Sequence, residues 1–197
     1  EIYPIYPKKE TSGRSEEYIG DWVKKKKNRD KIVIASKIAS GHPIGVGATG
    51  LAWIRNGKKH LKFDKKNINK AVNDSLKRLK TDYIDLYQLH WPDRNWVDFG
   101  TFGQTASIPD SGADRSETLV ALDELIQAGK IRSWGVSNES AWGVMDYVAR
   151  TTCGKDDQLR PASIQNAYSL LNRKFELSLA EVTFREGVGL LAYSPVA

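Results

Sequence analysis

The sequence predicts an α/β fold in which parallel strands alternate with helices, and three observations favour this class. Short apolar runs rich in β-branched residues alternate with segments whose apolar residues recur every three or four positions. No hairpin signal joins consecutive strands, so crossover connections and parallel pairing are expected. The strands are apolar on both faces, which is typical of a sheet covered by helices.

The elements follow one another in a regular order. A helix around residues 16–26 is followed by five expected strands: Ile32–Lys37, Tyr83–Leu89, Ile131–Val136, Ala162–Ala167 and Val188–Tyr193. The helices expected between the strands contain Ile68–Leu79, Leu119–Ile126, Trp142–Ala149 and Glu176–Phe184. Asp64 can cap the first of these four helices, and Gly129 can end the second. Asp85, inside the second strand, is expected to have a structural hydrogen-bonding role.

Two architectures fit this order, an open doubly wound sheet and a (β/α)8 barrel. No linker or change of composition divides the chain, so residues 1–197 are expected to form a single domain. A complete barrel typically needs about 250 residues. We therefore interpret the sequence as a partial (β/α)8 TIM barrel, in which the first strands and the last strand and helices are missing.

Composition excludes several classes of protein. With 40% hydrophobic and 27% charged residues the chain is globular, and no apolar run is long enough to span a membrane. The net charge is +6, but its basic cluster at residues 24–27 is expected to be a solvated helix end rather than a nucleic-acid surface. The single cysteine and scattered histidines predict neither disulfides nor a metal site, and the expected location is cytoplasmic.

Polar residues stand at the end of every expected strand. They are Lys37, His90, Ser137 with Asn138, Gln165 with Asn166, and Tyr193 with Ser194. A single lysine or histidine is more often a surface ion pair or a satisfied core residue. Because functional side chains of a barrel lie at the carboxyl ends of its strands, five such strands in succession favour one shared pocket.

These residue types suit one chemistry. A lysine beside a tyrosine is expected to lower the pKa of the phenol, so that the tyrosine can donate a proton near neutral pH. A histidine can orient a carbonyl oxygen, side-chain amides can hold a carboxamide, and an aromatic ring such as that of Tyr193 can stack on a planar ring. Together they indicate carbonyl reduction with hydride from a nicotinamide cofactor.

Six segments carry a resemblance that runs in order through almost the whole chain: GRSEEYIGDWV, IVIASKI, DSLKRLKTDYIDLYQLHWPD, AGKIRSWGVSNES, SIQNAYSLLNR and GVGLLAYSPVA. In these segments the chain resembles the aldo-keto reductase family, close to its bacterial Tas-like branch. The resemblance implies a (β/α)8 barrel that binds NADPH without a Rossmann domain. It also implies an oxidoreductase that reduces a small-molecule aldehyde or ketone to an alcohol.

The family's catalytic tetrad is Asp, Tyr, Lys and His. By the resemblance, the lysine falls on Lys37 and the histidine on His90. The tyrosine follows the aspartate in a D-T-A-E-x-Y pattern, whose tail matches Glu1-Ile2-Tyr3, so Tyr3 is the expected proton donor. The aspartate would precede residue 1. Tyr6 is the competing phenol, but it lacks the preceding Glu-x pair.

The resemblance also implies a cofactor site. Ser137, Asn138 and Gln165 would bind the nicotinamide carboxamide, Tyr193 would stack on its ring, and Ser194 would begin the pyrophosphate contacts. The family's adenosine-phosphate site lies beyond the seventh strand, where this sequence stops. Activity is therefore expected of a full-length protein rather than of these 197 residues alone.

The loop after His90 is the expected source of the substrate pocket. Trp91 resembles a pocket residue of the family. Trp96 can line the same pocket, because the loop leaves the catalytic end of the barrel. Packing of Trp96 against its own loop explains the residue equally well.

Two alternatives remain. The stretch GVGATG, residues 45–50, matches the G-x-G-x-x-G pattern of dinucleotide-binding folds. Gly41-His42-Pro43 separates it from the preceding strand, and no strand with an acidic end follows about 20 residues later, so it is interpreted as a loop.

The second alternative is a non-enzymatic NADPH-binding regulatory subunit that resembles potassium channel β-subunits. In those proteins the catalytic histidine is changed, whereas His90 is present here.

Overall fold

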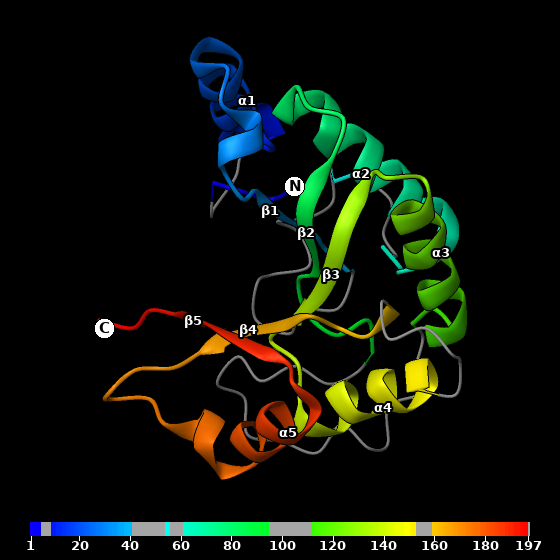
Figure 1. Cartoon of the computed structure of the whole chain (residues 1–197), viewed down its shortest axis with the longest axis vertical. Coiled ribbons are helices and arrows are strands. Elements are labelled where there is room, and N and C mark those ends of the chain that lie inside the picture. Colours follow the sequence, from blue (N-terminus) through cyan, green and yellow to red (C-terminus); the bar gives the residue numbers. More distant parts are fainter. Residues whose placement is uncertain (5–8, 41–53, 56–60, 95–111, 153–158, 197) are drawn as a thin grey trace.

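A single parallel sheet organises the chain (Figure 1). The structure, a computed structural model, describes residues 1–4, 9–40, 54–55, 61–94, 112–152 and 159–196. Within them, five strands pair in the order β1-β2-β3-β4-β5. Their bounds are Ala35–Ile38 (β1), Ile84–Leu89 (β2), Ile131–Ser137 (β3), Ser163–Ala167 (β4) and Gly189–Tyr193 (β5).

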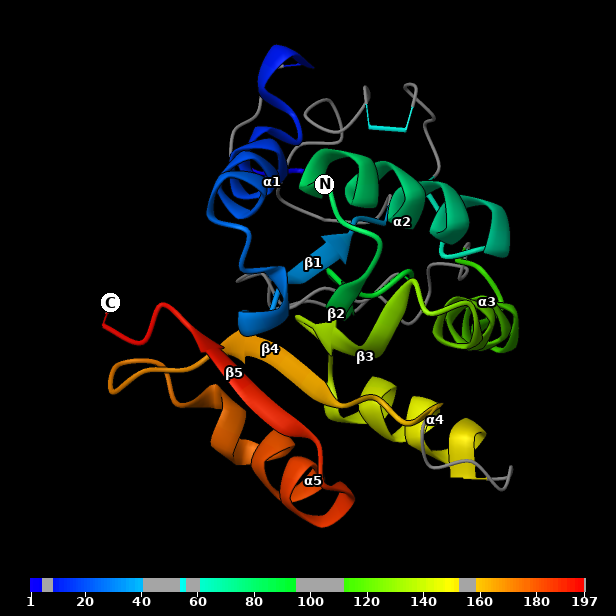
Figure 2. The same cartoon turned by 45° about the horizontal axis from the view of Figure 1, so that its top comes forward.

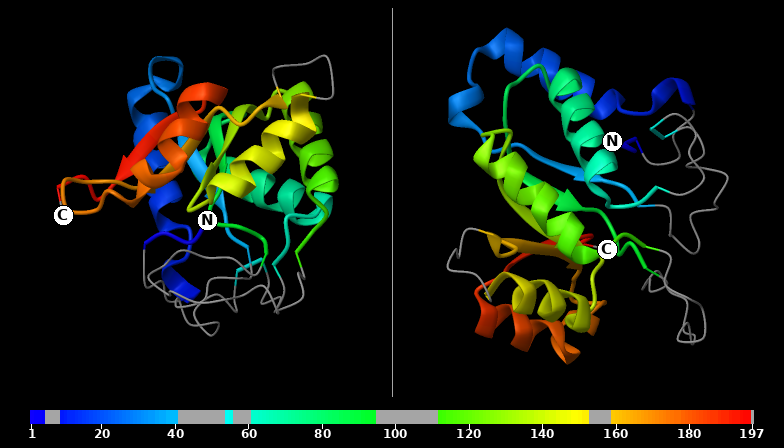
Figure 3. Two further views of the ribbon diagram at one scale, coloured as in Figure 1. Left: turned by 90° about the horizontal axis from the view of Figure 1, so that it is seen from below. Right: turned by 90° about the vertical axis from the view of Figure 1, so that its right-hand side faces the viewer.

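Helices connect the strands and cover the outer side of the curved sheet, as the views from below and from the side also show (Figure 3). The α-helices are α1 (Arg14–Lys26), α2 (Lys65–Leu79), α3 (Arg115–Gln127), α4 (Ala141–Thr152) and α5 (Leu179–Glu186). Short 3-10 helices are η1 (Lys9–Thr11), η2 (Arg29–Lys31) and η4 (Lys174–Leu177). None of the described helices is long and apolar enough to cross a membrane.

Each strand is parallel to its neighbour and next to it in the sequence (Figure 2). Lys37 is in register with Gln88, and Ser137 with Gln165. Because parallel strands all end at the same edge, the polar residues that follow them are brought together at one end of the sheet.

The helix boundaries agree with the signals in the sequence. The carboxylate of Asp64 accepts a hydrogen bond from the Asn67 backbone N–H at 2.8 Å and so caps α2, as predicted. Asp114 caps α3 in the same way by accepting from the Ser116 N–H. After α3, Gly129 adopts a φ of 68°, which is the left-handed conformation expected of a glycine that ends a helix.

Two predicted boundaries are wrong. The first strand is expected at Ile32–Lys37 but spans Ala35–Ile38. Pairing with β2 begins only at Ile34, whose carbonyl accepts from the Asp85 and Leu86 N–H groups, and Val33 is 81% exposed. The helix expected at 176–184 is split into η4 and α5, because Ser178 has a non-helical backbone with φ of −148°.

The main core lies between the sheet and its helices. Tyr87 of β2, Trp134 of β3 and Ile164 of β4 are fully buried there, against Leu79 of α2 and Leu122 of α3. Helices α1 and α2 pack so closely that a Cβ at Gly20 would overlap the carbonyl oxygen of Arg78. Burial of this apolar surface is the main source of stability.

At the amino ends of the strands, Asp85 forms a compact ionic cluster, which confirms its expected structural role. Its Oδ2 accepts from the Ile34 N–H at 2.9 Å and from Arg29 at 2.7 Å, and its Oδ1 accepts from Arg132 at 2.9 Å. Both guanidinium groups also lie over the Tyr83 ring, 3.7 and 4.1 Å from its centroid. The cluster joins β1, β2 and β3 at the end opposite to the candidate site.

Candidate active site

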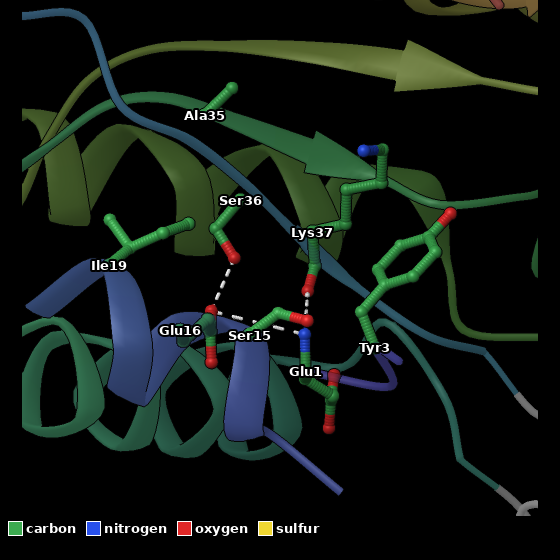
Figure 4. Close-up of a pocket in the computed structure, with 8 residues that line it drawn as sticks. All are labelled: Glu1, Tyr3, Ser15, Glu16, Ile19, Ala35, Ser36 and Lys37. Atoms are coloured by element: carbon green, nitrogen blue, oxygen red, sulfur yellow. Dashed lines mark hydrogen bonds and ion pairs between the residues drawn. The ribbon is translucent and has the colours of Figure 1, made fainter. Parts of the chain in front are cut away.

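The three residues expected to perform catalysis lie together. The Tyr3 hydroxyl is 3.4 Å from Nε2 of His90, and their rings are 5.6 Å apart. Nζ of Lys37 is 5.7 Å from the centroid of the Tyr3 ring. Figure 4 shows the Lys37 side chain and the Tyr3 ring beside each other above β1. A phenol, an ammonium group and an imidazole therefore converge at one point.

The strand ends create this convergence. Lys37 is the third residue of β1, and His90 directly follows β2, where its N–H donates to the Ile38 carbonyl at 2.9 Å. Tyr3 comes from the segment at the start of the chain, whose Glu1 nitrogen donates to the Lys37 carbonyl at 3.4 Å. Glu1 and Tyr3 also line a pocket of about 160 Å³ that extends between α1 and β1 (Figure 4).

Burial favours the uncharged forms of these groups. It raises the pKa of the Tyr3 phenol and lowers the pKa of the Lys37 ammonium group. His90 is 6% exposed, and burial together with the positive charge of Lys37 holds its pKa well below the usual value. At neutral pH, His90 is therefore a neutral imidazole that can donate or accept one hydrogen bond at Nε2.

The expectation that Lys37 lowers the pKa of Tyr3 is wrong for this structure. The pKa of Tyr3 is raised, and its cause is the loss of water around the phenol. The ammonium group of Lys37, 5.7 Å from the ring centroid, does not outweigh that loss. At neutral pH the Tyr3 phenol is therefore protonated.

Asn138 links the site to the last described strand. Its Nδ2 donates to the His90 carbonyl at 2.9 Å, and its Oδ1 accepts from the Tyr193 hydroxyl at 2.7 Å. The backbone of Asn138 has a φ of 52°, a left-handed conformation that asparagine tolerates better than most residues. The amide therefore bridges β2, β3 and β5 at their carboxyl ends.

Ser137 and Gln165 form the neighbouring part of the site. The Ser137 hydroxyl donates to the Gln165 carbonyl at 2.8 Å. The side-chain oxygen Oε1 of Gln165 is buried and has no hydrogen-bond partner within the described residues. A buried acceptor without a partner is costly unless a bound group satisfies it. The amide of a nicotinamide carboxamide has the donor that this oxygen needs, so these residues fit such a cofactor.

The other residues expected at the site are Trp91, Ser194 and Trp96. Trp91 is 3% exposed, lies with its ring 4.3 Å from the His90 ring at a tilt of 35°, and donates its indole N–H to the Ser40 carbonyl at 3.1 Å. It therefore supports His90 from behind as part of the packed wall. Ser194 follows β5, is exposed, and has a φ of 53°. Trp96 and the stretch GVGATG lie outside the described residues.

Sequence reasoning missed the ionic support beneath Asn138. Arg94, four residues after His90, donates through Nη1 to the Glu139 carboxylate at 2.8 Å, and both residues are buried. Asn166 fixes the Glu139 backbone by donating to its carbonyl at 3.0 Å. A Cβ at Gly143 would overlap this pair, so α4 also packs tightly against it. No spacing in the sequence signals a pair 45 residues apart.

The curved parallel sheet, its outer helices and the polar site at the strand ends define an α/β-barrel protein. The chain belongs to the aldo/keto reductase family, whose model matches residues 1–197. It is 46% identical over 198 residues to the protein tas of Escherichia coli K12, an alignment that covers 98% of this chain and 53% of that protein. It is 40% identical over 177 residues to an aldo-keto reductase of Babesia bovis, covering 85% and 59%.

Solved structures agree with this assignment. A crystal structure of an aldo-keto reductase from Klebsiella pneumoniae in complex with NADPH matches with a TM-score of 0.65 and 27% identity, over 93% of this chain and 49% of that one. The holo form of an aldo-keto reductase from Bacillus halodurans matches with a TM-score of 0.62 and 28% identity, over 91% and 48%. The predicted barrel class and family are thus confirmed. The chain spans about half the length of the curated relatives it matches.

Proposed function

We propose that the full-length protein containing this chain is an NADPH-dependent reductase that converts an aldehyde or ketone to an alcohol. One observation carries the proposal: the Tyr3 hydroxyl lies 3.4 Å from the buried, neutral His90 imidazole and beside Lys37. The chain's membership of the aldo/keto reductase family supports the same chemistry.

In this proposal Tyr3 is the proton donor. NADPH, when bound, supplies the hydride that reduces the carbonyl carbon. The Tyr3 hydroxyl gives its proton to the carbonyl oxygen, so that an alcohol leaves and a phenolate remains until solvent returns the proton. The raised pKa of Tyr3 keeps the proton in place before the reaction, and the Lys37 charge stabilises the phenolate as it forms.

His90 has a different role. Because burial keeps its imidazole neutral, it can donate one hydrogen bond to the substrate oxygen without competing with Tyr3 as an acid. Trp91 holds the ring from behind, and Asn138 holds the His90 carbonyl. These contacts fix the direction in which the imidazole meets the carbonyl oxygen.

The chain's own residues also suit the nicotinamide end of the cofactor. Gln165 and Ser137, with Asn138 beside them, would bind the carboxamide, and the unpartnered Oε1 of Gln165 supports this role. Tyr193, held by Asn138 at 2.7 Å, would stack on the ring, and Ser194 would begin the contacts to the pyrophosphate. Trp96 would border the substrate, while Trp91 would hold the His90 ring that meets it.

The test uses the purified full-length protein. We expect it to consume NADPH in the presence of aromatic aldehydes, with turnover followed by the loss of NADPH absorbance and NADH run in parallel. Cofactor binding is measured separately by quenching of tryptophan fluorescence. Tight NADPH binding without turnover of any aldehyde or ketone would replace the reductase with a regulatory NADPH-binding subunit. Absence of both binding and turnover would refute the proposal.

A further inference from the structure

A buried ion pair lies next to Tyr3, outside the set of residues assigned above. Arg55 donates through Nη1 to both carboxylate oxygens of Glu1, at 2.7 and 2.6 Å. The two side chains are almost inaccessible to solvent, at 2% and 5% of their full exposure. Glu1 is two residues before Tyr3, so the pair acts on the segment that carries the phenol.

The same ion pair also forms hydrogen bonds with the backbone at the end of β1, the strand that carries Lys37. Oε2 of Glu1 accepts from the Ala39 N–H at 3.0 Å, and Nη2 of Arg55 donates to the Ala39 carbonyl at 2.6 Å. The Glu1 nitrogen donates to the carbonyl of Lys37 itself. Both backbone groups of Ala39 are therefore held by one ion pair that also holds the Tyr3 segment.

Apolar contacts close around this arrangement. Ile54, next to Arg55, packs in a cluster with Ile2, Ala39, Leu61 and Trp91, and Tyr3 packs against the same cluster. Trp91 is also the ring that backs His90. The apolar cluster beside the ion pair therefore contains Ala39, two residues after Lys37, and Trp91, which backs His90. Tyr3 packs against the same cluster.

We infer that Arg55 is a positioning residue, which through Glu1 and Ala39 sets the Tyr3 hydroxyl at its distance from His90 and Lys37. The inference rests on the proposed function, in which Tyr3 donates the proton. A buried ion pair contributes little net stability compared with apolar residues of similar size, so the geometry it imposes is its main effect. The planar fork of arginine holds its donors to the carboxylate and to the carbonyl in one fixed geometry, which the ammonium group of lysine does not impose.

The decisive comparison is between Arg55→Met and the double variant Arg55→Met/Glu1→Gln. The single variant leaves the Glu1 carboxylate buried without its cation and is expected to lose stability. The double variant removes that charge, so its melting temperature should recover. Positioning should not recover, because the fork remains absent. Arg29→Met, which breaks a buried pair at the opposite end of the strands, is the matched control.

We expect kcat to fall about 100-fold in both Arg55 variants, since displacement of a reacting group by about 1 Å has that effect. The Kd for NADPH should stay within about twofold. Arg55→Lys, which keeps the charge but not the fork, should recover part of kcat, and Arg29→Met should keep it. If kcat recovers together with the melting temperature in the double variant, or never falls in the single one, the inference is overturned.

A second readout does not depend on turnover. Ring-¹³C-labelled tyrosine is titrated by NMR, with the Tyr3 signal assigned from Tyr3→Phe. Release of the phenol from its buried position in Arg55→Met should bring the Tyr3 pKa down toward its usual value. If the wild type reduces no carbonyl but this shift occurs, the proposed function fails while the positioning by Arg55 stands. An unchanged Tyr3 signal in an active enzyme would overturn the positioning alone.

Discussion

At the amino ends of the strands, both carboxylate oxygens of Asp85 accept hydrogen bonds, from Arg29, Arg132 and the Ile34 N–H. At the carboxyl ends, the buried Oε1 of Gln165 has no hydrogen-bond partner among the described residues. The Asp85 carboxylate therefore has all the hydrogen bonds described above, whereas the Gln165 amide oxygen lacks a donor in the described part of the chain. The Asp85 carboxylate is thus part of a closed network that joins β1, β2 and β3, whereas the Gln165 side chain in β4 is left with an open acceptor there.

This difference distinguishes the groups that stabilise the fold from the groups proposed to act in binding and catalysis. A satisfied buried carboxylate holds three strands together, whereas an unsatisfied amide and a neutral buried His90 lower the stability of the folded state. Such features persist where function requires them, because a ligand supplies the missing partner. Substitutions at the amino ends should thus change unfolding, and substitutions at the carboxyl ends should change turnover or binding.

The largest effect is expected for Tyr3→Phe. Removal of the hydroxyl eliminates the proposed proton donor and should lower kcat by about 10²- to 10⁴-fold, in the range of general acid catalysis. The melting temperature and NADPH affinity should change little, because the ring remains packed. Steady-state kinetics and fluorescence titration of the full-length protein measure both quantities. Tyr6→Phe removes the competing phenol and serves as the control; a large loss there with none in Tyr3→Phe would reverse the assignment.

Asp85→Ala should have the next largest effect, and on stability alone. Arg29 would lose its carboxylate, and the Ile34 N–H would lose its acceptor. Removal of one partner of a buried pair costs about 3 kcal/mol of unfolding free energy. Urea unfolding measures this loss, while kcat per folded molecule should be unchanged. Glu181→Ala, which breaks an ion pair with both side chains 70% exposed, should cost less than about 0.5 kcal/mol.

An Asp85→Ala variant with normal stability, or with kcat reduced tenfold or more, would contradict the separation between the two ends. The first outcome would mean that Arg29 and Ile34 find water as an equivalent partner. The second would mean that the amino-end cluster reaches the catalytic groups through β2.

The amino-acid sequence predicts that polar side chains meet at one edge of the sheet, because parallel strands end at a common edge. Lys37 lies near the end of β1, and His90 and Asn138 directly follow β2 and β3, so their proximity can be inferred from the order of the strands. The bridge that Asn138 makes between His90 and Tyr193 could not be foreseen, since it depends on a left-handed backbone at one residue. Strand ends are thus predictable, and the hydrogen bonds between them are not.

The ion pairs that support the site escape prediction for a related reason. Arg55 meets Glu1 across 54 positions, and Arg94 meets Glu139 across 45. Neither contact belongs to a helix or strand, so no periodic pattern reports it. The predicted direction of the shift in the Tyr3 pKa is wrong because burial of the phenol outweighs the neighbouring charge, and residue types alone do not reveal that burial.

A third, smaller effect is expected for Gln165→Leu. This variant tests whether the unpartnered Gln165 amide oxygen serves cofactor binding. Loss of one hydrogen bond to the carboxamide should weaken NADPH binding about tenfold. Unfolding free energy should be unchanged or higher, because an unpartnered buried acceptor is replaced by an apolar group. Fluorescence titration and urea unfolding measure the two changes. Gln127→Leu, at the end of α3, is the control. Lower stability with unchanged affinity would show that Gln165 is structural.

The smallest effect concerns pH and compares the two ends directly. Burial and the charge of Lys37 lower the pKa of His90, whereas an unfolded histidine titrates near 6.5. As the pH falls below about 6.5, the unfolded state binds a proton that the folded state refuses, so stability is lost. Burial alone raises the pKa of Asp85, but hydrogen bonds from Ile34 and Arg29 and the nearby guanidinium charges lower it overall. Its contribution is therefore present above about pH 4 and lost below it.

Unfolding free energies measured at pH 7 and pH 6 distinguish the ends. Wild type should be less stable at pH 6 by less than about 1 kcal/mol through His90, and His90→Asn should remove this loss. Asp85→Asn should leave the change between pH 7 and pH 6 intact and alter only the acid limb below about pH 4. If Asp85→Asn abolishes the loss near pH 6, the two ends titrate as one unit. In that case the division between a closed amino end and an open carboxyl end does not hold, because charge at one end would control stability at the other.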